Sequence, residues 1–327
     1  MEIIFEDLFF NTFIYFLKNA VSFLKSFLWS YKRISINLFL AYLALGLILY
    51  FIFKSKESKN VRAFFKFLFP KEIYTHPSAI MDYKSKIFKI LLFPPKLLYI
   101  PVSSILISTY TLKILNTFHK FGWEKLGPTG YGVFIIGFVG FLAQDFAEFF
   151  NHWLAHKVRP YWEIHSVHHS AEVLTPVTTK RHHPIFGVIS GAIKVFILGV
   201  TQGILVWLLF KSVDFYLLFS LNYLTLAFNL LGGSFRHSHI WISFGWFNKI
   251  IISPAMHQIH HSVDEKHRNK NMGLWLTIWD RMFGTLYIPE KKEELSFGLE
   301  KGMKNPHDTL FNFFIGPLKK IVLLIKK

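Results

Sequence analysis

Residues 34–53 read ISINLFLAYLALGLILYFIF, a run of twenty residues without a charge, and this stretch decides the class of fold. Lys32 and Arg33 precede the run, and Lys54 and Lys56 follow it. A helix rises about 1.5 Å per residue, so a run of this length covers the roughly 30 Å hydrocarbon core of a bilayer. We therefore expect a transmembrane helix here and an all-α integral membrane protein.

Two further apolar segments lie at 185–210 and 213–231, and only Lys211 and Ser212 separate them. Each segment is long enough to span a bilayer as a helix. The pair predicts a helical hairpin that crosses the membrane and returns.

The segments 99–118 and 131–151 leave two interpretations open. Several Ser and Thr residues dilute the first segment, and the second is apolar only as far as Ala143, before Asp145 and Glu148. The apolar part of the second makes about 21 Å of helix, which is short of a full crossing. The two segments either cross with a tilt or form a shallow re-entrant pair. In total we expect four to five transmembrane or re-entrant helices.

The composition supports a membrane protein and excludes several chemistries. Hydrophobic residues make up 52% of the chain and charged residues 17%, whereas soluble domains carry about 25% charged residues. The formal charge of +17 lies in loops between apolar runs. We therefore expect anionic lipid head groups as partners, and no nucleic acid. The chain has no cysteine, which excludes disulfides, iron–sulfur clusters, cysteine nucleophiles and zinc sites built on Cys.

The distribution of basic residues predicts the orientation. Residues 54–98 contain ten Lys or Arg, whereas the loop 119–130 contains two. By the positive-inside rule, 54–98 lies in the cytoplasm. Both pairs of apolar segments return the chain to the side from which it started. The two histidine-rich stretches, 152–183 and 237–267, should therefore share the cytoplasmic face and form one cap.

Histidine is the functional signal of this sequence, because 13 of the 16 histidines fall between positions 152 and 267. Residues three and four apart share a helix face, and neutral imidazole is a good ligand for Fe, Zn, Cu and Ni. The spaced motifs contain eight histidines and a tetrahedral zinc takes four, so the sequence predicts two metal ions. The clusters are His152-x3-His156, His165-x2-His168-His169, Arg236-His237-Ser-His239 and His257-x2-His260-His261.

Other metal motifs are absent from the sequence. There is no H-E-x-x-H, which argues against a zinc metalloprotease, and no Glu-x-x-His pair of the soluble di-iron bundles. Asp145 and Glu148 share a predicted helix face with His152 and His156. These carboxylates are candidates for compensating the metal charge or for accepting from ring N–H groups.

These residues together resemble the fatty acid hydroxylase superfamily, which includes sterol desaturases, C-4 sterol methyl oxidases, sphingolipid hydroxylases and alkylglycerol monooxygenase. The first part of the match runs from Asp145 through the first two histidine motifs to Arg181-His182-His183-Pro184. The second part comprises Pro254 to Ser262, Asn271-x-Gly273 and Trp279 to Thr285. The resemblance covers about residues 130 to 290.

The resemblance implies a membrane-bound di-iron oxygenase whose only catalytic residues are metal ligands. His183 and His239 are further ligand candidates, and Asp145, Glu148, Asn271 and Asp280 are expected to support the ligands. The implied ligands are His152, His156, His165, His168, His169, His237, His257, His260 and His261.

The implied reaction uses two Fe and O2 to hydroxylate or desaturate a lipid C–H bond. The chain has no G-x-G-x-x-G motif, so electrons should come from outside, through cytochrome b5, ferredoxin or a pterin with its reductase. The identity of the lipid, the reaction outcome and the choice of iron or zinc stay open. Two alternatives use the same clusters, namely a membrane metal carrier and a di-zinc hydrolase.

The predicted organisation has three parts. Residues 1–130 contain an amphipathic helix, the first span and the basic cytosolic segment. Residues 131–290 form the catalytic domain that resembles the fatty acid hydroxylases. Residues 291–327 form an amphipathic tail that ends in a surface helix.

Overall fold

The computed structural model describes residues 36–37, 39–53, 60–92, 99–118, 130–209 and 233–326. The chain divides into two compact units, 1–59 and 60–327. In the first unit, the apolar helix Phe39–Phe53 forms the C-terminal part of the predicted first span. Three predicted features lie outside the described residues: the amphipathic helix that precedes the first span, the loop 119–129, and the return helix at 213–231.

The second unit is built from helices joined by loops, and its described residues contain no β-strand beyond two isolated bridges. This confirms the predicted all-α class for the described part. The α-helices are α2 (Val61–Leu68), α3 (Lys71–Tyr74), α4 (Pro77–Leu92), α5 (Tyr99–Phe118), α6 (Gly130–Lys157), α7 (Arg159–His169), α8 (Pro184–Leu209), α11 (Pro254–His260), α12 (Ile278–Met282), α13 (Leu310–Phe314) and α14 (Gly316–Ile325). The short 3-10 helices are η2 (Pro176–Lys180), η3 (Gly233–Phe235), η4 (Gly245–Lys249) and η5 (Glu265–His267).

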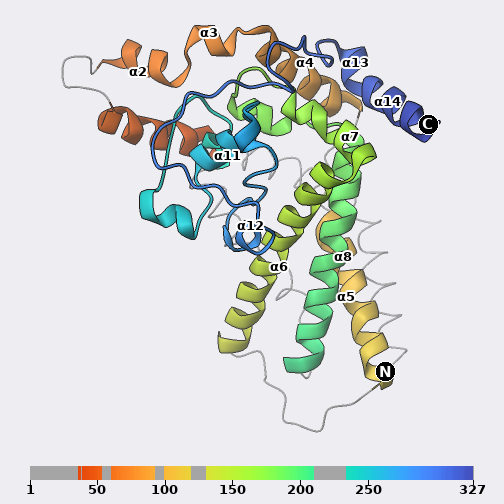
Figure 1. Cartoon of the computed structure of the whole chain (residues 1–327). Helices are drawn as coiled ribbons and strands as arrows, with labels where there is room; N and C mark the ends of the chain where they lie inside the picture. The colour runs from red at the N-terminus through yellow and green to blue at the C-terminus, as the bar shows by residue number, and fades with distance from the viewer. Residues whose placement is uncertain are drawn as a thin grey trace. The chain divides into compact units, whose positions relative to one another are not determined.

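Two helices of the described part are long and apolar enough to cross a membrane, Phe134–Lys157 within α6 and all of α8. The 28 residues of α6 make about 42 Å of helix. The apolar run ends at Ala143 but the helix continues to Lys157, which agrees with the helix face predicted for Asp145, Glu148, His152 and His156. Asp145 and Glu148 continue the helix because each has partners: Asp145 accepts the Trp275 N–H, and Glu148 pairs with Lys194 of α8 at 2.5 Å. In Figure 1, α5, α6 and α8 run side by side away from the histidine-rich part.

Close packing joins α5 to α8. A Cβ added at Gly199 would lie 2.7 Å from the Ser104 carbonyl oxygen, and one at Gly203 would lie 2.8 Å from that of Ser108. Small residues four apart let two helix backbones approach in this way. Ser104, Ser108 and Thr111, three of the polar residues that dilute the apolar character of α5, therefore line a helix–helix contact.

A buried ion pair fixes α4 to the end of α7. Arg181 Nη1 donates to Asp82 Oδ1 at 2.6 Å, and both side chains are fully buried. Arg181 Nε also donates to the Val167 carbonyl oxygen at 2.9 Å, and Nη2 donates to Ser170 Oγ at 3.0 Å. A buried charge is stable only when it is paired and hydrogen-bonded. The contacts on Val167 and Ser170 flank His168 and His169, so this network holds the end of α7 in place.

The C-terminal residues form part of the same unit. Phe313 of α13 is buried with Met81 and Val167, and Leu318 and Ile321 of α14 pack against the cluster around Tyr161. The predicted surface helix at 308–327 is therefore two helices with one packed face, while Leu323 and Ile325 remain exposed.

Candidate metal centre

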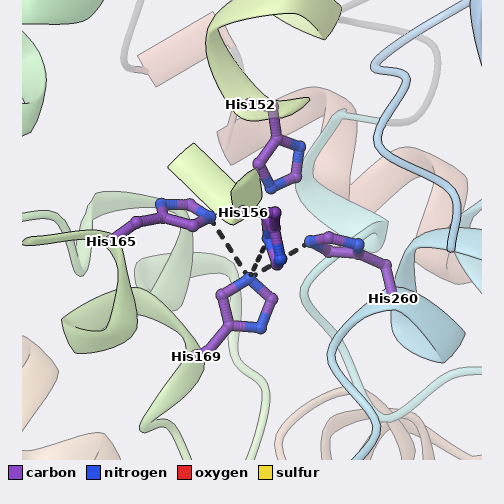
Figure 2. A group of neighbouring side chains, drawn as sticks. All are labelled: His152, His156, His165, His169 and His260. Atoms are coloured by element: carbon purple, nitrogen blue, oxygen red, sulfur yellow. Dashed lines mark hydrogen bonds between the residues drawn. The ribbon is translucent and has the colours of Figure 1, made fainter. Parts of the chain in front are cut away.

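Nine histidines of the described residues converge into two groups whose ring nitrogens lie within 4.8 Å of one another in each group. They come from three helices and from the turn after η3. Figure 2 shows the rings of the first group turned toward a common space. The first group is His152 and His156 of α6, His165 and His169 of α7, and His260 of α11. The second group is His168 of α7, His237 after η3, His257 of α11 and His261, the residue that follows α11.

The two H-x2-H-H motifs serve the two groups in opposite ways. In α7 the residues four apart, His165 and His169, belong to the first group, and His168 belongs to the second. In the second motif the residues four apart, His257 of α11 and His261 just after it, belong to the second group, and His260 belongs to the first. Consecutive helical residues point about 100° apart, so an adjacent His-His pair reaches two sites at once. This geometry explains why both motifs end in two histidines.

Local sequence positions α11 for this role. The helix starts at Pro254, and the Ser253 hydroxyl accepts from the Met256 N–H to cap the first turn. Proline suits the first helical position because its missing N–H has no partner in the helix there. All seven residues of α11 are buried, which fixes the direction of each ring.

Each group has one central ring. His169 Nε2 lies 3.1 Å from His156 Nε2, and it lies 3.2 Å from the Nε2 atoms of His165 and His260; Figure 2 marks these three contacts with dashed lines. In the second group, His237 Nε2 lies 3.2 Å from His168 Nε2 and 3.1 Å from the Nε2 atoms of His257 and His261.

Backbone acceptors determine which nitrogen of a ring carries the hydrogen. His152 Nδ1 donates to the Met272 carbonyl oxygen at 2.8 Å, and His260 Nδ1 donates to that of Lys270 at 2.7 Å. In a neutral imidazole the other nitrogen, Nε2, then has a lone pair and no hydrogen. His152 Nε2 is buried and has no hydrogen-bond partner among the described residues.

These contacts fit bound cations better than hydrogen bonds alone. A neutral His169 has at most one hydrogen on Nε2, so it can donate to only one of its three neighbours. The remaining lone pairs would face one another in a buried space, which is unfavourable without a positive charge between them. Two nitrogens at about 2.1 Å from one metal lie about 3.0 Å apart at a right angle and about 3.4 Å apart at a tetrahedral angle. The observed separations of 3.1 and 3.2 Å fall in this range.

Burial keeps the rings in the form that binds metal. It holds the pKa of His168, His169 and His237 well below its usual range, and neighbouring imidazoles lower it further. The same cause lowers the pKa of His261 to about 3. Metal ligation requires neutral imidazole, so the site is prepared for cations at neutral pH.

Asp280 and Asn271 support the loop that carries these backbone acceptors. Asp280 accepts from the N–H groups of Met272 and Gly273, both at 2.7 Å, and from the Thr285 hydroxyl at 2.6 Å. The Asn271 amide donates to the Met256 carbonyl oxygen at 3.1 Å and accepts from the Tyr287 N–H at 2.8 Å. Both residues act on the backbone beside the ligands.

Asp145 and Glu148 lie on the predicted helix face but serve other partners. Asp145 accepts from the backbone N–H groups of Trp275 and Leu276 and from the Trp279 indole. Glu148 pairs with Lys194. Neither carboxylate accepts a hydrogen bond from a ring of the two groups; the His152 and His260 rings donate instead to the carbonyl oxygens of Met272 and Lys270.

The structure places His182, His183, His239 and His307 outside the two groups. His183 Nε2 donates to the Phe314 carbonyl oxygen at 2.9 Å, and His239 Nε2 donates to that of Phe67 at 2.8 Å. The ring of His182 stacks on His168, with ring centroids 4.0 Å apart. His307 is fully buried between α7 and α13.

Sequence reasoning missed two side chains that touch rings of the two histidine groups. Asn269 Oδ1 lies 3.2 Å from His156 Nδ1, and Thr179 Oγ1 lies 3.2 Å from His237 Nδ1. Asn269 and Asn271 both have positive φ, 58° and 55°, a conformation that asparagine adopts more readily than most residues. The Asn269-x-Asn271 pattern could have indicated a loop with positive φ at this position.

Comparison with known proteins finds relatives that act on lipids. The chain is 25% identical over 186 residues to ornithine lipid hydroxylase of Rhizobium tropici, which is 56% of this chain and 50% of the relative. It is 30% identical over 159 residues to alkylglycerol monooxygenase of Xenopus tropicalis, covering 49% of this chain and 32% of the relative. It is 25% identical over 270 residues to Delta(7)-sterol 5(6)-desaturase of Eremothecium gossypii, covering 80% of this chain and 66% of the relative.

The chain thus spans half the length of the first relative and about a third of the second. No solved structure matches the chain significantly. The sequence model of the family described as fatty acid hydroxylase matches residues 137–285, which include all nine histidines of the two groups. The segment 137–285 is thus similar to the fatty acid hydroxylase family, and the relatives above are named for reactions on lipids.

Proposed function

We propose that this protein is a membrane-bound non-haem di-iron oxidoreductase that uses O2 to hydroxylate or desaturate a lipid C–H bond. The observation that carries the proposal is the convergence of nine buried or partly buried imidazoles into two adjacent groups, within the segment that matches the family. Five nitrogens for one ion and four for the other leave room for O2, which a catalytic site needs.

The proposed roles follow from the ligand contacts. His152, His156, His165, His169 and His260 would hold one iron, and His168, His237, His257 and His261 the other. The iron pair would supply the O2 activation and C–H cleavage that no side chain of this chain can perform. The protein fixes the rings through the carbonyl groups of Lys270 and Met272 and excludes water from them by burial.

The balance of the reaction requires a reductant. Hydroxylation converts a C–H bond and O2 into C–OH and water, and it consumes two electrons and two protons. Because the sequence has no flavin or nicotinamide motif, we propose an external donor such as cytochrome b5, ferredoxin or a pterin with its reductase. The donor would approach from the cytoplasm, the side that the basic residues of 54–98 predict for the histidine cap.

A lipid is the proposed substrate class. The relatives are named as an ornithine lipid hydroxylase, an alkylglycerol monooxygenase and a sterol desaturase. The two long apolar helices, α6 and α8, lead from a candidate membrane region to the cap, and exposed side chains such as Phe134, Phe138 and Phe196 offer surface to acyl chains. Hydroxylation and desaturation begin with the same C–H cleavage, and the shape of the substrate pocket decides between them.

The geometry does not favour the two alternatives. A carrier would need ligands that release the metal and that lie along the spans. Here the His152 and His260 rings are fixed by hydrogen bonds, and the α7 and α11 rings are buried in the cap. A di-zinc hydrolase fits the nitrogen donors, but the relatives are named as oxygen-using enzymes or desaturases.

The test is oxygen incorporation. Purified protein from iron-replete cells would be placed in lipid nanodiscs that contain a total lipid extract, with ferredoxin and its reductase as electron donor, under labelled O2. The proposal expects lipid-dependent O2 uptake and a lipid product that gains labelled oxygen or loses two hydrogens. O2 uptake that does not depend on lipid, or hydrolysis products without oxidation, would contradict it.

A further inference from the structure

An exposed apolar patch lies beside α6 and outside the metal centre. We call this patch the aromatic shelf; it consists of Phe244, Trp246, Phe247 and Ile250 around η4 and Ile278, Met282 and Phe283 at α12. Trp246 is 63% exposed, Phe247 58% and Met282 67%. Large apolar side chains that are exposed together usually mark an interaction site.

The shelf is held by ordered backbone contacts. The Lys249 carbonyl oxygen accepts from the Thr277 hydroxyl at 2.7 Å and from Arg281 Nη2 at 2.9 Å. The Thr277 N–H donates to the Ile250 carbonyl oxygen at 3.0 Å, and Ile251 and Leu276 form an antiparallel bridge. These bonds join η4 to α12, so both present their apolar side chains as one fixed surface.

The shelf continues directly onto a helix that can span a membrane. Trp279 contacts Phe146 of α6 with ring centroids 5.0 Å apart. Phe283 contacts Phe149 at 4.9 Å and Trp153 at 5.3 Å. In Figure 1, α12 lies against the side of α6, below α11 and the histidine-rich part.

The charge of the shelf matches a lipid surface. Its exposed charged residues are Lys249 and Arg281, and the one acidic residue within 241–252 and 274–286 is Asp280, which is fully buried. Trp and Phe together with Lys and Arg are typical of segments at the boundary between water and acyl chains. Anionic head groups attract such basic residues.

We propose that the aromatic shelf inserts into the interface of the bilayer, next to α6, and attaches the histidine cap to the membrane surface. The occupant of the shelf is therefore lipid, with its acyl chains against the aromatic rings and its phosphate groups near Lys249 and Arg281. This inference does not depend on the reaction that the metal centre performs.

A structural consequence follows for the metal centre. Asp280 belongs to α12, and it binds the N–H groups of Met272 and Gly273 in the loop that holds His152. The membrane attachment and the first histidine group are thus parts of one hydrogen-bonded segment. Insertion of the shelf would set the depth of the metal centre relative to the lipid head groups.

The absence of cysteine from the chain makes a direct test possible. Single cysteines would be introduced as Trp246→Cys, Met282→Cys and, as a control, Lys304→Cys, whose side chain is 90% exposed. Each full-length variant would be labelled with the environment-sensitive fluorophore NBD. It would then be reconstituted in vesicles of phosphatidylcholine and phosphatidylglycerol, with and without lipids that carry a quencher in the acyl chain.

We expect blue-shifted emission and strong quenching by these lipids at positions 246 and 282, and neither effect at 304. Quenching at 282 should fall about twofold when Trp246→Ser and Phe247→Ser are added, because two anchoring rings are lost. Water-like, unquenched emission at 246 and 282 would overturn the proposal. Blue-shifted emission that the lipids do not quench would also overturn it, since a second protein copy or another protein would then cover the shelf.

Discussion

The carboxylate of Asp280 and the imidazole of His152 bind the two ends of one peptide group. The Gly273 N–H donates to Asp280 Oδ2 at 2.7 Å, and the Met272 carbonyl oxygen of the same peptide accepts from His152 Nδ1 at 2.8 Å. When the Gly273 N–H donates to the carboxylate, the peptide group is polarised. The Met272 carbonyl oxygen then accepts a stronger hydrogen bond from the His152 ring. Metal sites often orient a histidine by a direct carboxylate contact, and here a peptide stands between the two.

The first prediction concerns this chain of contacts from Asp280 through the 272–273 peptide to His152, which we call the relay. Asp280→Asn replaces one carboxylate oxygen by an NH2 group, which cannot accept a hydrogen bond from the N–H of Met272 or Gly273. The 272–273 peptide therefore loses the contact that positions it. Metal affinity at the first group should fall roughly 10- to 100-fold, as for other residues that orient ligands. Competition with a chelator measures this affinity. Asp308→Asn is the control, since it makes the same change at an exposed carboxylate that lies 3.9 Å from Lys304; equal affinities in all three proteins would disprove the relay.

A second prediction tests the same relay from the backbone side. A Cβ at Gly273 would lie 2.7 Å from Asp280 Oδ2 and 2.9 Å from the Leu276 carbonyl oxygen. Gly273→Ala should therefore displace Asp280 and reproduce the metal loss of Asp280→Asn. Gly140→Ala is the matched control, because nothing lies within 4 Å of its added Cβ. A Gly273→Ala protein with wild-type metal affinity would show that the loop tolerates the shift without effect on His152.

The third prediction separates the two histidine groups. His257 and His260 lie on the same helix but belong to different groups. Each Ala variant should lose about one metal ion per chain and all turnover, because one of the nitrogens that would hold that metal is missing. His76→Ala should change neither quantity, since His76 only accepts from the Ser78 N–H near the start of α4. Metal analysis of the purified variants decides this, and full metal content in either ligand variant would refute the assignment.

A fourth prediction addresses the helix contact that supports the apolar part. In Gly203→Leu the new Cβ would lie 2.6 Å from the Cβ of Thr111, which is too close, so α5 and α8 must separate. Overpacking of this kind costs roughly 1–3 kcal/mol. The thermal midpoint of the detergent-solubilised protein should fall by several degrees. Gly187→Leu, at an open position of the same helix, should leave the midpoint nearly unchanged; an equal decrease in both variants would contradict the close contact.

The fifth prediction concerns pH. Burial lowers the pKa of His307 to about 4, whereas an unfolded histidine titrates near 6.5. Below pH 6.5 the unfolded chain therefore binds a proton that the folded chain does not, and stability falls as the pH falls toward 4. The loss from this residue between pH 7.5 and 5 is about 2 kcal/mol.

His307→Asn removes the titrating group and retains a donor for the Asn312 carbonyl oxygen, which His307 Nδ1 meets at 3.2 Å. Thermal midpoints of the metal-free protein at the two pH values give the measurement. The variant should lose less stability on acidification than the wild type. Identical pH dependence in the two proteins would contradict the prediction, because it would show that unfolding causes no proton uptake at His307.

The histidine spacing predicted eight of the nine residues that converge, because i, i+3 and i+4 positions on a helix are a local property of the sequence. The ninth, His237, followed only from the family resemblance. The assignment of His168 and His260 to opposite groups was not predictable, since it depends on how α7 and α11 cross in space. The acceptors of the His152 and His260 rings are backbone carbonyls, which any residue type provides. Sequence reasoning therefore turned to carboxylates such as Asp145.

The apolar pattern was informative about α8 and less so about its neighbours. Ser104 and Ser108 weakened the interpretation of α5 as a membrane helix, although they mark its contact with Gly199 and Gly203. The continuation of α6 past Asp145 depends on partners 130 residues away in the sequence. The C-terminal tail was expected at the surface, but Phe313 is buried because Met81 and Val167 meet it in the fold.

The central claim is that the two histidine groups hold two iron ions, and metal analysis of the wild-type protein tests it most directly. The protein would be expressed with iron and without excess zinc, purified in detergent, and analysed for metal per chain, with Mössbauer spectroscopy to show whether the irons are coupled. We predict about two irons per chain in a coupled pair. Two zinc ions per chain under these conditions, or a single uncoupled iron, would contradict the account.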